Sequence, residues 1–341
     1  MTAEEARALI LRSALPAPLA EVSTRPFREL CRMAGAPITF TGMVSAKGLL
    51  ADLRRSTRLL DWGKGDRPVF CQIFGPEPEP MAEAARLCKE RGADGIDINM
   101  GCPVRKVISQ RSGADLLRDL PRAKEVIAAV VEAARPLAVS IKTRKGWSEG
   151  DDAGLKIAEF AAELGVAFLT IHARTVEQGF SGEPDLGFLR EVASGVPIPV
   201  VGNGGVKSPS DALRMLEETG CAGVMVGRGI MGDPWLLARI GAALKGLPCP
   251  PRPSLEERVS TAIWHAREIV KDMGERGVPL AKRVASWYVK GLEGAKALRR
   301  ALMTARSLDE IIGILKGYAS ALGADVRTIG PEPRVRGAVG G

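Results

Sequence analysis

Short apolar runs and amphipathic segments alternate along the chain from residue 15 to residue 244. Eight of the apolar runs fit buried strands: Leu15–Leu19, Ile38–Met43, Pro68–Phe74, Gly95–Met100, Leu137–Thr143, Ala167–His172, Ile198–Gly202 and Gly223–Val226. Helical periodicity occupies the intervals, for example at Met81–Arg91, Pro121–Ala134, Gly154–Leu164 and Ser210–Glu218. Eight strand–helix repeats over about 230 residues predict an α/β fold, a (β/α)8 TIM barrel.

A large doubly wound sheet is the alternative architecture for eight such strands. It would be expected to bind a dinucleotide through a Gly-x-Gly-x-x-Gly motif after the first strand. The first strand runs instead into Pro16-Ala-Pro-Leu-Ala20, so this alternative loses its main support.

The alternation ends at a proline-rich segment. Four prolines lie within Leu247–Pro253, which can neither continue a helix nor join a sheet ladder. Ser254-Leu-Glu-Glu257 then has the form of a capped helix start, and helical periodicity continues to Leu322. We therefore predict a TIM barrel at residues 1–246, a linker at 247–253, a small all-helical C-terminal domain at 254–325 and a disordered tail at 326–341.

Positive charge is concentrated in the last quarter of the chain. The 341 residues carry a formal net charge of +8, and from Leu247 onward 16 Lys and Arg face 10 Asp and Glu. A solvated helical surface explains this excess as readily as a face for a polyanion such as RNA. Charge alone leaves both interpretations open.

Several classes of protein are disfavoured by composition. No uninterrupted apolar stretch reaches about 18 residues, so we expect no membrane span. The acidic start lacks a basic region before an apolar segment, which favours the cytoplasm. Only two histidines and six scattered cysteines occur, so we expect no metal centre. We also expect a monomer.

Two glycine-rich loops follow the last two predicted strands, Gly202-Asn-Gly-Gly205 and Gly227-Arg-Gly229. Glycines let backbone N–H groups approach phosphate oxygens, and Arg228 adds a forked cation. One such loop would indicate only a tight turn. Both loops together, at the positions where many barrels bind phosphate, predict a phosphate site.

Charged side chains collect at other predicted strand ends. Alternation sends Lys142 and Arg144 to one side of the fifth strand. A buried lysine needs an anionic partner, either a reduced flavin ring or an acid from a neighbouring strand. His172 and Arg174 reach the same rim, although a lone histidine is more often structural. Gln72, in the third strand, can both donate to and accept from a planar heterocycle.

Cys102 lies where the fourth strand gives way to a turn, in Asp97-Ile-Asn-Met-Gly-Cys-Pro103. A nucleophile would need a paired histidine, and none is near in sequence. A metal ligand would need partners. A general acid needs only a protonated thiol aimed at the substrate, so this role fits best, with a structural cysteine as the alternative.

With these motifs the chain resembles the tRNA-dihydrouridine synthases, in particular a bacterial subgroup often labelled B-type. The resemblance spans roughly residues 14 to 245 and rests on these segments: Ala17-Pro-Leu-Ala20, Thr41-Gly-Met-Val-Ser-Ala-Lys47, Gln72-Ile-Phe-Gly75, Asp97-Ile-Asn-Met-Gly-Cys-Pro103, Lys106-Val, Gly113-Ala-x-Leu-Leu117, Lys142-Thr-Arg144, His172-Ala-Arg-Thr175, Gln178-Gly-Phe-Ser-Gly182, Asn203-Gly-Gly205 and Gly227-Arg-Gly229.

The resemblance implies an FMN-binding barrel that uses NADPH, or NADH, to reduce the C5–C6 double bond of a uridine in tRNA. Ribosomal RNA stays open as another target. The implied proton donor to C5 is Cys102. The implied contacts to FMN are Pro18, Leu19, Ala20, Gln72, Lys142, His172, Asn203, Gly204, Gly205, Gly227 and Arg228, and the implied contacts to the substrate are Asn99, Arg144 and Arg174. The basic helical domain would grip RNA.

Three positions depart from the family pattern. Gly42 stands where relatives commonly carry an acid, and Gly205 stands where aspartate is usual. The segment Lys282–Tyr288 lacks the Arg-Lys-His usual before its aromatic pair. Two other functions fit the same residues, a flavin reductase of a free small molecule and a non-catalytic RNA-binding barrel.

Overall fold

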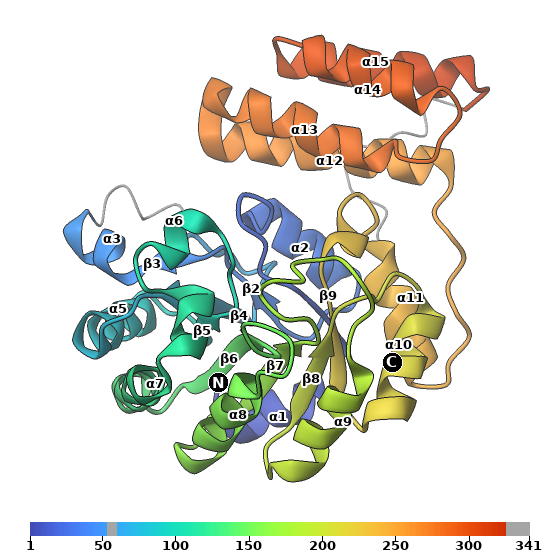
Figure 1. Ribbon diagram of the computed structural model, residues 1–341. Coiled ribbons are helices and arrows are strands. Elements are labelled where there is room, and N and C mark those ends of the chain that lie inside the picture. Colours follow the sequence, from blue (N-terminus) through green and yellow to red (C-terminus); the bar gives the residue numbers. More distant parts are fainter. Residues whose placement is uncertain (53–59, 325–341) are drawn as a thin grey trace.

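An all-parallel sheet curved into a nearly closed barrel forms the centre of this computed structural model, which describes residues 1–52 and 60–324 (Figure 1). Neighbouring strands follow the order β1-β9-β8-β7-β6-β5-β4-β2, and β3 also pairs with β4. The strands are β1 (Ala14–Pro16), β2 (Thr39–Phe40), β3 (Val44–Ser45), β4 (Val69–Phe74), β5 (Gly95–Met100), β6 (Ala138–Arg144), β7 (Phe168–His172), β8 (Val200–Asn203) and β9 (Gly223–Val226).

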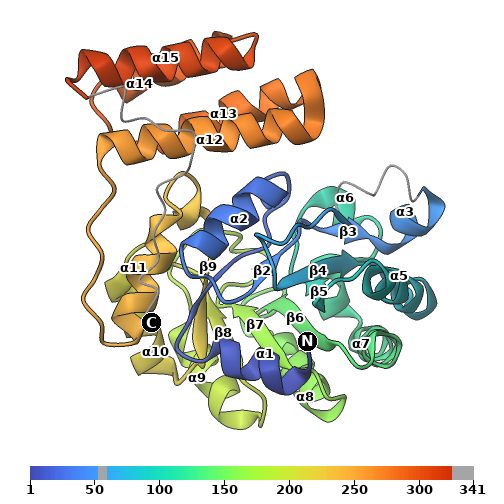
Figure 2. The same ribbon diagram turned by 180° about the vertical axis from the view of Figure 1, so that it is seen from behind.

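Helices surround this barrel on the outside and continue beyond its last strand (Figures 1 and 2). They are α1 (Ala3–Ile10), α2 (Arg25–Met33), α3 (Ala46–Ala51), α5 (Pro78–Glu90), α6 (Arg105–Ile108), η2 (Gly113–Arg118), α7 (Leu120–Ala134), α8 (Ala153–Glu163), α9 (Leu186–Gly195), α10 (Pro209–Thr219), η3 (Arg228–Ile230), α11 (Trp235–Leu244), α12 (Leu255–Met273), η4 (Gly274–Gly277), α13 (Val278–Tyr288), α14 (Ala295–Thr304) and α15 (Leu308–Ala321). Within the described ranges, none of them combines the length and apolarity that a membrane crossing requires.

The predicted TIM barrel is confirmed, with one predicted strand broken in two. The run Ile38–Met43 contains β2, and the ladder then stops until β3 begins at Val44. The hydroxyl of Thr41 accepts the backbone N–H of Gln72 at 2.9 Å, a donor that an unbroken ladder would pair with a backbone carbonyl. This side chain replaces a ladder bond, so the strand divides at Thr41 and Gly42.

The amino-terminal helix α1 closes one end of the barrel, and the sequence analysis missed it. Thr2 and Glu5 form a capping box that starts the helix. Ile10 is fully buried against the barrel interior, where the rings of Phe70 and Phe168 pack 5.8 Å apart. The strands therefore surround a filled apolar core, and ligands have access only from the carboxyl-terminal end of the barrel.

The helical region α12–α15 lies over that open end (Figures 1 and 2). Ser254 and Glu257 form the expected capping box, and α15 ends at Ala321, one residue before the predicted limit. The predicted tail at 326–341 lies outside the described residues. The division of the chain into two domains stays a prediction, because the buried core runs continuously from the barrel into these helices.

Aromatic contacts join the helical region to the barrel. Tyr288 of α13 packs edge-on against Trp235 of α11, with ring centroids 6.2 Å apart, and its hydroxyl lies 2.9 Å from Nδ1 of His265. The backbone of Gly232 approaches the same part of α13. A Cβ at Gly232 would lie 2.4 Å from the backbone of Trp287, and its φ of +76° also favours glycine.

We therefore expect Gly232→Ala to weaken the docking of the helical region. The clash and the left-handed backbone together should lower the free energy of unfolding by more than about 2 kcal/mol. Thermal melting measures this loss, and proteolysis at the 247–253 linker should accelerate. The control is Gly241→Ala in α11, where a Cβ meets nothing within 4 Å, so that change should be neutral or mildly stabilising. Equal melting temperatures for both variants would contradict the close contact.

Candidate active site

A cavity of about 310 Å³ opens at the carboxyl-terminal ends of the strands. Its wall includes the residues that the sequence analysis proposed as a site, with the exception of Gln72: Pro18, Leu19, Ala20, Asn99, Cys102, Lys142, Arg144, His172, Arg174, Asn203, Gly204, Gly205, Gly227 and Arg228. Segments up to about 210 residues apart in the chain thus meet in one place, as the rim of a barrel requires.

The register of the parallel strands explains why these side chains are neighbours. Asn99 of β5 is paired with Lys142 of β6, and Arg144 of β6 is paired with His172 of β7. His172 is in turn paired with Asn203 of β8. Polar residues at or near the carboxyl ends of four adjacent strands therefore form a polar row along one side of the cavity.

Positive charge dominates this row. The ammonium group of Lys142 donates a hydrogen bond of 3.2 Å to Oδ1 of Asn203, and the amide of Asn203 is held by the carbonyl of Met225. Burial and the nearby Arg144 lower the pKa of Lys142 to about 8. Burial likewise lowers the pKa of Arg144 to about 10. In the described part of the chain no carboxylate forms an ion pair with Lys142, although Asp97 of the neighbouring strand acts on it electrostatically and opposes the fall of its pKa.

His172 is a neutral histidine with a free ring nitrogen. Burial lowers its pKa to about 2, and the surrounding cations Lys142, Arg144, Arg174 and Arg228 act in the same direction. Its Nδ1 is buried and makes no hydrogen bond to any described residue. A buried nitrogen of this kind costs free energy until a ligand pairs with it.

The two glycine-rich loops lie on the same side of the cavity. Gly204 has a φ of +119° and Gly205 a φ of +77°, so the backbone here adopts a turn that a side chain would strain. Arg228 is exposed at the mouth. Its guanidinium lies 4.0 Å from the ring centroid of Phe180. Backbone amides beside a free guanidinium form a suitable anion site.

Phe180 is a cavity residue that the sequence analysis did not single out. Its ring is 55% exposed, unusual for phenylalanine, and packs between Arg228 and the ring of His172 at a centroid distance of 6.0 Å. Its loop is shaped by two predicted substrate residues. Arg144 donates to the carbonyls of Thr175 and Gly179, and Arg174 donates to those of Ser181 and Gly182. The available signal in the sequence was a phenylalanine within the Gly- and Ser-containing segment Gln178-Gly-Phe-Ser-Gly182.

Cys102 lies beside the cationic row, since the carbonyl of its neighbour Gly101 accepts from Arg144 Nε at 3.0 Å, and it is held by its backbone. Its N–H donates to Oδ1 of Asn99 at 3.1 Å, and its carbonyl accepts the N–H of Ala114 at 3.1 Å. Burial raises the pKa of the thiol above its ordinary value, although Lys142 and Arg144 oppose the shift. The thiol is therefore protonated at neutral pH, the state that a proton donor requires.

A chain of hydrogen bonds beneath the cavity fixes Asn99. Asp97, fully enclosed within the barrel, accepts from Ser140 Oγ at 2.6 Å and from Gln72 Nε2 at 2.7 Å. Gln72 Oε1 in turn accepts from the amide of Asn99 at 2.8 Å. Burial raises the pKa of Asp97 to about 6. Gln72 therefore lies below the cavity instead of lining it, and its predicted contact with a cofactor stays a prediction.

No group of three or more His, Cys, Asp and Glu side chains suited to a metal ion occurs within residues 1–52 and 60–324. The fold and the cavity thus define the class: a (β/α)8-barrel enzyme with a cationic, glycine-lined site at the carboxyl-terminal rim.

Comparison with known proteins narrows this class. A family model described as dihydrouridine synthase matches residues 15–319. The tRNA-dihydrouridine synthase B of Xanthomonas axonopodis pv. citri is 34% identical over 91% of this chain and 93% of its own length. The protein of the same name from Pseudomonas aeruginosa is 36% identical over 83% of this chain and 85% of its own length.

The solved structure of 6-hydroxypseudooxynicotine amine oxidase from Pseudomonas geniculata N1 shares the barrel fold. Its TM-score is 0.50, at 13% identity over 69% of this chain and 47% of that one. The chain belongs to the dihydrouridine synthase family, whose members are flavin-dependent oxidoreductases.

The hydrogen bonds around Asn99 predict a change in thiol reactivity. In Asn99→Ala the loop loses its acceptor, so Cys102 should become more exposed and its raised pKa should fall toward the ordinary value of about 8.5. We expect severalfold faster alkylation of Cys102 at near-neutral pH, measured by mass spectrometry of labelled peptides.

The exposed Cys249 serves as an internal control, because its alkylation rate should not change. Unaltered reactivity of Cys102 in Asn99→Ala would show that the amide does not position the thiol.

Proposed function

We propose that this protein is an FMN-dependent tRNA-dihydrouridine synthase that uses NADPH to reduce the C5–C6 double bond of specific uridines. One observation carries the proposal: a cationic wall without an ion-paired acid and a protonated thiol line the same cavity. The first feature suits a phosphorylated, electron-accepting ring system, and the second suits proton donation to carbon. Family membership and the names of the two relatives support the same reaction.

The residues present fit FMN. The loops at Gly204 and Gly227, with Arg228, would hold its phosphate through backbone amides and a guanidinium. The unpaired Nδ1 of His172 and the ammonium of Lys142 would bind polar atoms of the flavin. The apolar side chains of Pro18, Leu19 and Ala20 would line a flat ring. When bound and reduced, FMN supplies a hydride to C6 of the uracil.

Cys102 completes the reaction at the other carbon. Its Sγ–H bond breaks, the proton adds to C5, and the thiolate regains a proton from solvent. Because burial keeps the thiol protonated at neutral pH, the donor is ready before the substrate arrives. Asn99 fixes the backbone of Cys102, so Asp97 and Gln72 act as positioning residues through it.

The target uridine must leave the RNA fold to reach this rim, which costs a few kcal/mol. The helical region lies over the same end of the barrel, and residues 254–325 carry 12 Lys and Arg against 9 Asp and Glu, a net charge of +3. Contacts between its Lys and Arg side chains and the RNA backbone would offset that cost. We infer that residues 254–325 act as an RNA-binding domain on a catalytic barrel.

Replacing the thiol provides the first test of the proposal. Cys102→Ala should keep bound, yellow FMN and normal flavin reduction by NADPH, but should lower dihydrouridine formation by about 10²-fold or more because the proton donor is lost. Mass spectrometry of tRNA from single-turnover reactions measures the product.

Cys249→Ala, at an exposed cysteine outside the cavity, is the matched control and should behave like the wild-type protein. A colourless wild-type protein that cannot be reconstituted with FMN would sink the proposal. Activity on free uracil but not on tRNA would favour a small-molecule reductase instead.

The lowered pKa of Lys142 leads to a prediction of how FMN binding depends on pH. Its pKa of about 8 means that its positive charge is present below that pH and is lost as the pH rises through it. Cys102 and Arg144 titrate at higher pH, so they hold their charge states over this interval. The affinity of the apoprotein for FMN should therefore fall by up to about tenfold between about pH 7 and about pH 9.

Fluorescence titration of FMN measures this affinity. Lys142→Met should bind FMN more weakly and should lose the pH dependence, whereas Lys245→Met, at the exposed position that follows α11, should keep it. The same slope in Lys142→Met as in the wild-type protein would assign the titration to another group.

A further inference from the structure

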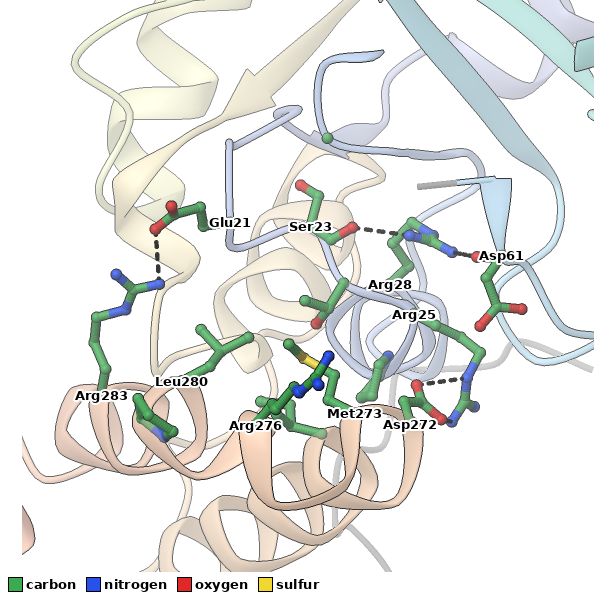
Figure 3. A pocket seen from close by; sticks show the side chains of 15 residues that line it. Glu21, Ser23, Arg25, Arg28, Asp61, Asp272, Met273, Arg276, Leu280 and Arg283 are labelled. Carbon is green, nitrogen blue, oxygen red and sulfur yellow. Dashed lines mark hydrogen bonds and ion pairs between the residues drawn. The ribbon is translucent and has the colours of Figure 1, made fainter. Parts of the chain in front are cut away.

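A second cavity, of about 450 Å³, lies between the barrel and the helical region (Figure 3). Its barrel side comes from residues 21–28, Gly42 and Asp61, and its other side comes from the end of α12, η4 and α13. It is larger than the cavity that holds Cys102, and the proposed reaction leaves it without a role.

The two cavities share a wall. Ala20 lines the first and its neighbour Glu21 lines the second. In the same way Met43 lines the first and Gly42 lines the second. Gly42 has no side chain, and a Cβ there would meet only one atom, at 3.9 Å. A polymer whose one unit occupies the first cavity can therefore place an adjoining unit in the second.

Ion pairs flank the second cavity and account for part of its charge. Arg25 bonds Asp272 of α12 at 2.6 Å (Figure 3). It also bonds Glu268 of α12 at 3.1 Å and Glu29 of α2. Arg28 is buried against Asp66. Arg25 thus joins the barrel to the helices, whereas Arg28 binds only barrel residues, and neither arginine is free to bind a ligand.

Two other arginines are available. Arg276 makes no hydrogen bond or ion pair recorded among the described residues, and Figure 3 shows its side chain rising from the helices toward the barrel side of the cavity. Arg283 bonds Glu21 at 2.9 Å, but Glu21 is 73% exposed and the pair is weak. The Nε of Arg283 is buried without a partner, as is Oγ1 of Thr24 on the opposite wall.

Apolar side chains alternate with these cations. Arg276, Leu280 and Arg283 follow one another at helical spacing along η4 and α13, and Met273 and Ile269 of α12 extend the apolar part of the wall. A guanidinium binds phosphate with a forked geometry, and a flat base packs against apolar side chains and guanidinium planes. The wall thus matches the two parts of a nucleotide.

We propose that this second cavity binds the nucleotide adjoining the target uridine in the RNA strand. The base lies against Leu280 and Met273, and the phosphate contacts Arg276 and Arg283. Occupation of both cavities holds two successive nucleotides out of the RNA fold, on the two sides of the wall at Gly42. This inference rests on the proposed function, because the target uridine defines which nucleotide adjoins it.

Two variants of the holoenzyme test the proposal. Arg276→Ala removes the free cation, and Leu280→Trp fills the apolar part of the cavity. For each variant we expect the Kd for tRNA, measured by filter binding, to rise about fivefold or more, because the contact with one stacked or phosphate-bound nucleotide is lost. The rate of flavin reduction by NADPH without RNA should not change. The matched controls are Arg214→Ala on α10 and Leu9→Trp on α1, both exposed and remote from the cavity, and they should bind tRNA normally.

A modified substrate connects the cavity to one nucleotide. After the target uridine is mapped, tRNAs that lack the base on its 5′ or 3′ side are compared with intact tRNA. One of the two modified tRNAs should bind the wild-type protein about fivefold more weakly than intact tRNA does. The same modified tRNA and intact tRNA should bind Leu280→Trp equally well, because the cavity is already filled in that variant.

The remaining outcomes separate the possible errors. A Kd within twofold of the wild-type value in both variants would overturn the proposal. Slower flavin reduction by NADPH with unchanged tRNA binding would also overturn the proposal, because the second cavity would then bind NADPH. A wild-type protein that binds tRNA but forms no dihydrouridine would refute the proposed function, while tRNA binding by the variants would still test the cavity.

Discussion

The parallel closure of the sheet is the constraint on which the site depends. Because adjacent strands run in one direction and in register, Asn99 meets Lys142, and Arg144, His172 and Asn203 continue the row. This geometry brings together side chains whose charged forms are destabilised by burial. Among the described residues, no carboxylate at the rim forms an ion pair with Lys142. The barrel core, closed at its other end by α1, must be stable enough to hold that charge until an anionic ligand arrives.

The thiol at the same rim has a different requirement, since the proposed proton donor must stay protonated and well placed. Asp97, Gln72 and Asn99 form a line of hydrogen bonds inside the barrel that ends at the backbone of Cys102. Burial raises the pKa of the thiol, while the nearby cations Lys142 and Arg144 moderate the shift. The helical region then limits how a long substrate can approach, because it covers the open end and is fixed there by Tyr288 and by the close contact at Gly232.

Periodicity predicted most of the barrel because strands such as β5 and β9 are short, apolar and bounded by turn residues, and the glycine-rich loops identified the rim. The break between β2 and β3 was not predictable, because a hydroxyl from Thr41 replaces a ladder bond to a distant strand. The position of Gln72 below the cavity was missed for a similar reason, since its partners Asp97 and Asn99 come from another strand. The second cavity exists only because the helical region docks on the barrel, and no local sequence pattern predicts how far apart these two parts lie.

The central claim is that the rim brings a reduced flavin and a proton donor to the two carbons of one double bond. It is tested most directly by following the label from NADPH deuterated at the transferred position during reduction of tRNA in ordinary water. The account predicts dihydrouridine with deuterium at C6 and solvent hydrogen at C5, located by NMR of the isolated nucleoside. Deuterium at C5, or tRNA left without dihydrouridine by a protein fully loaded with FMN, would contradict it.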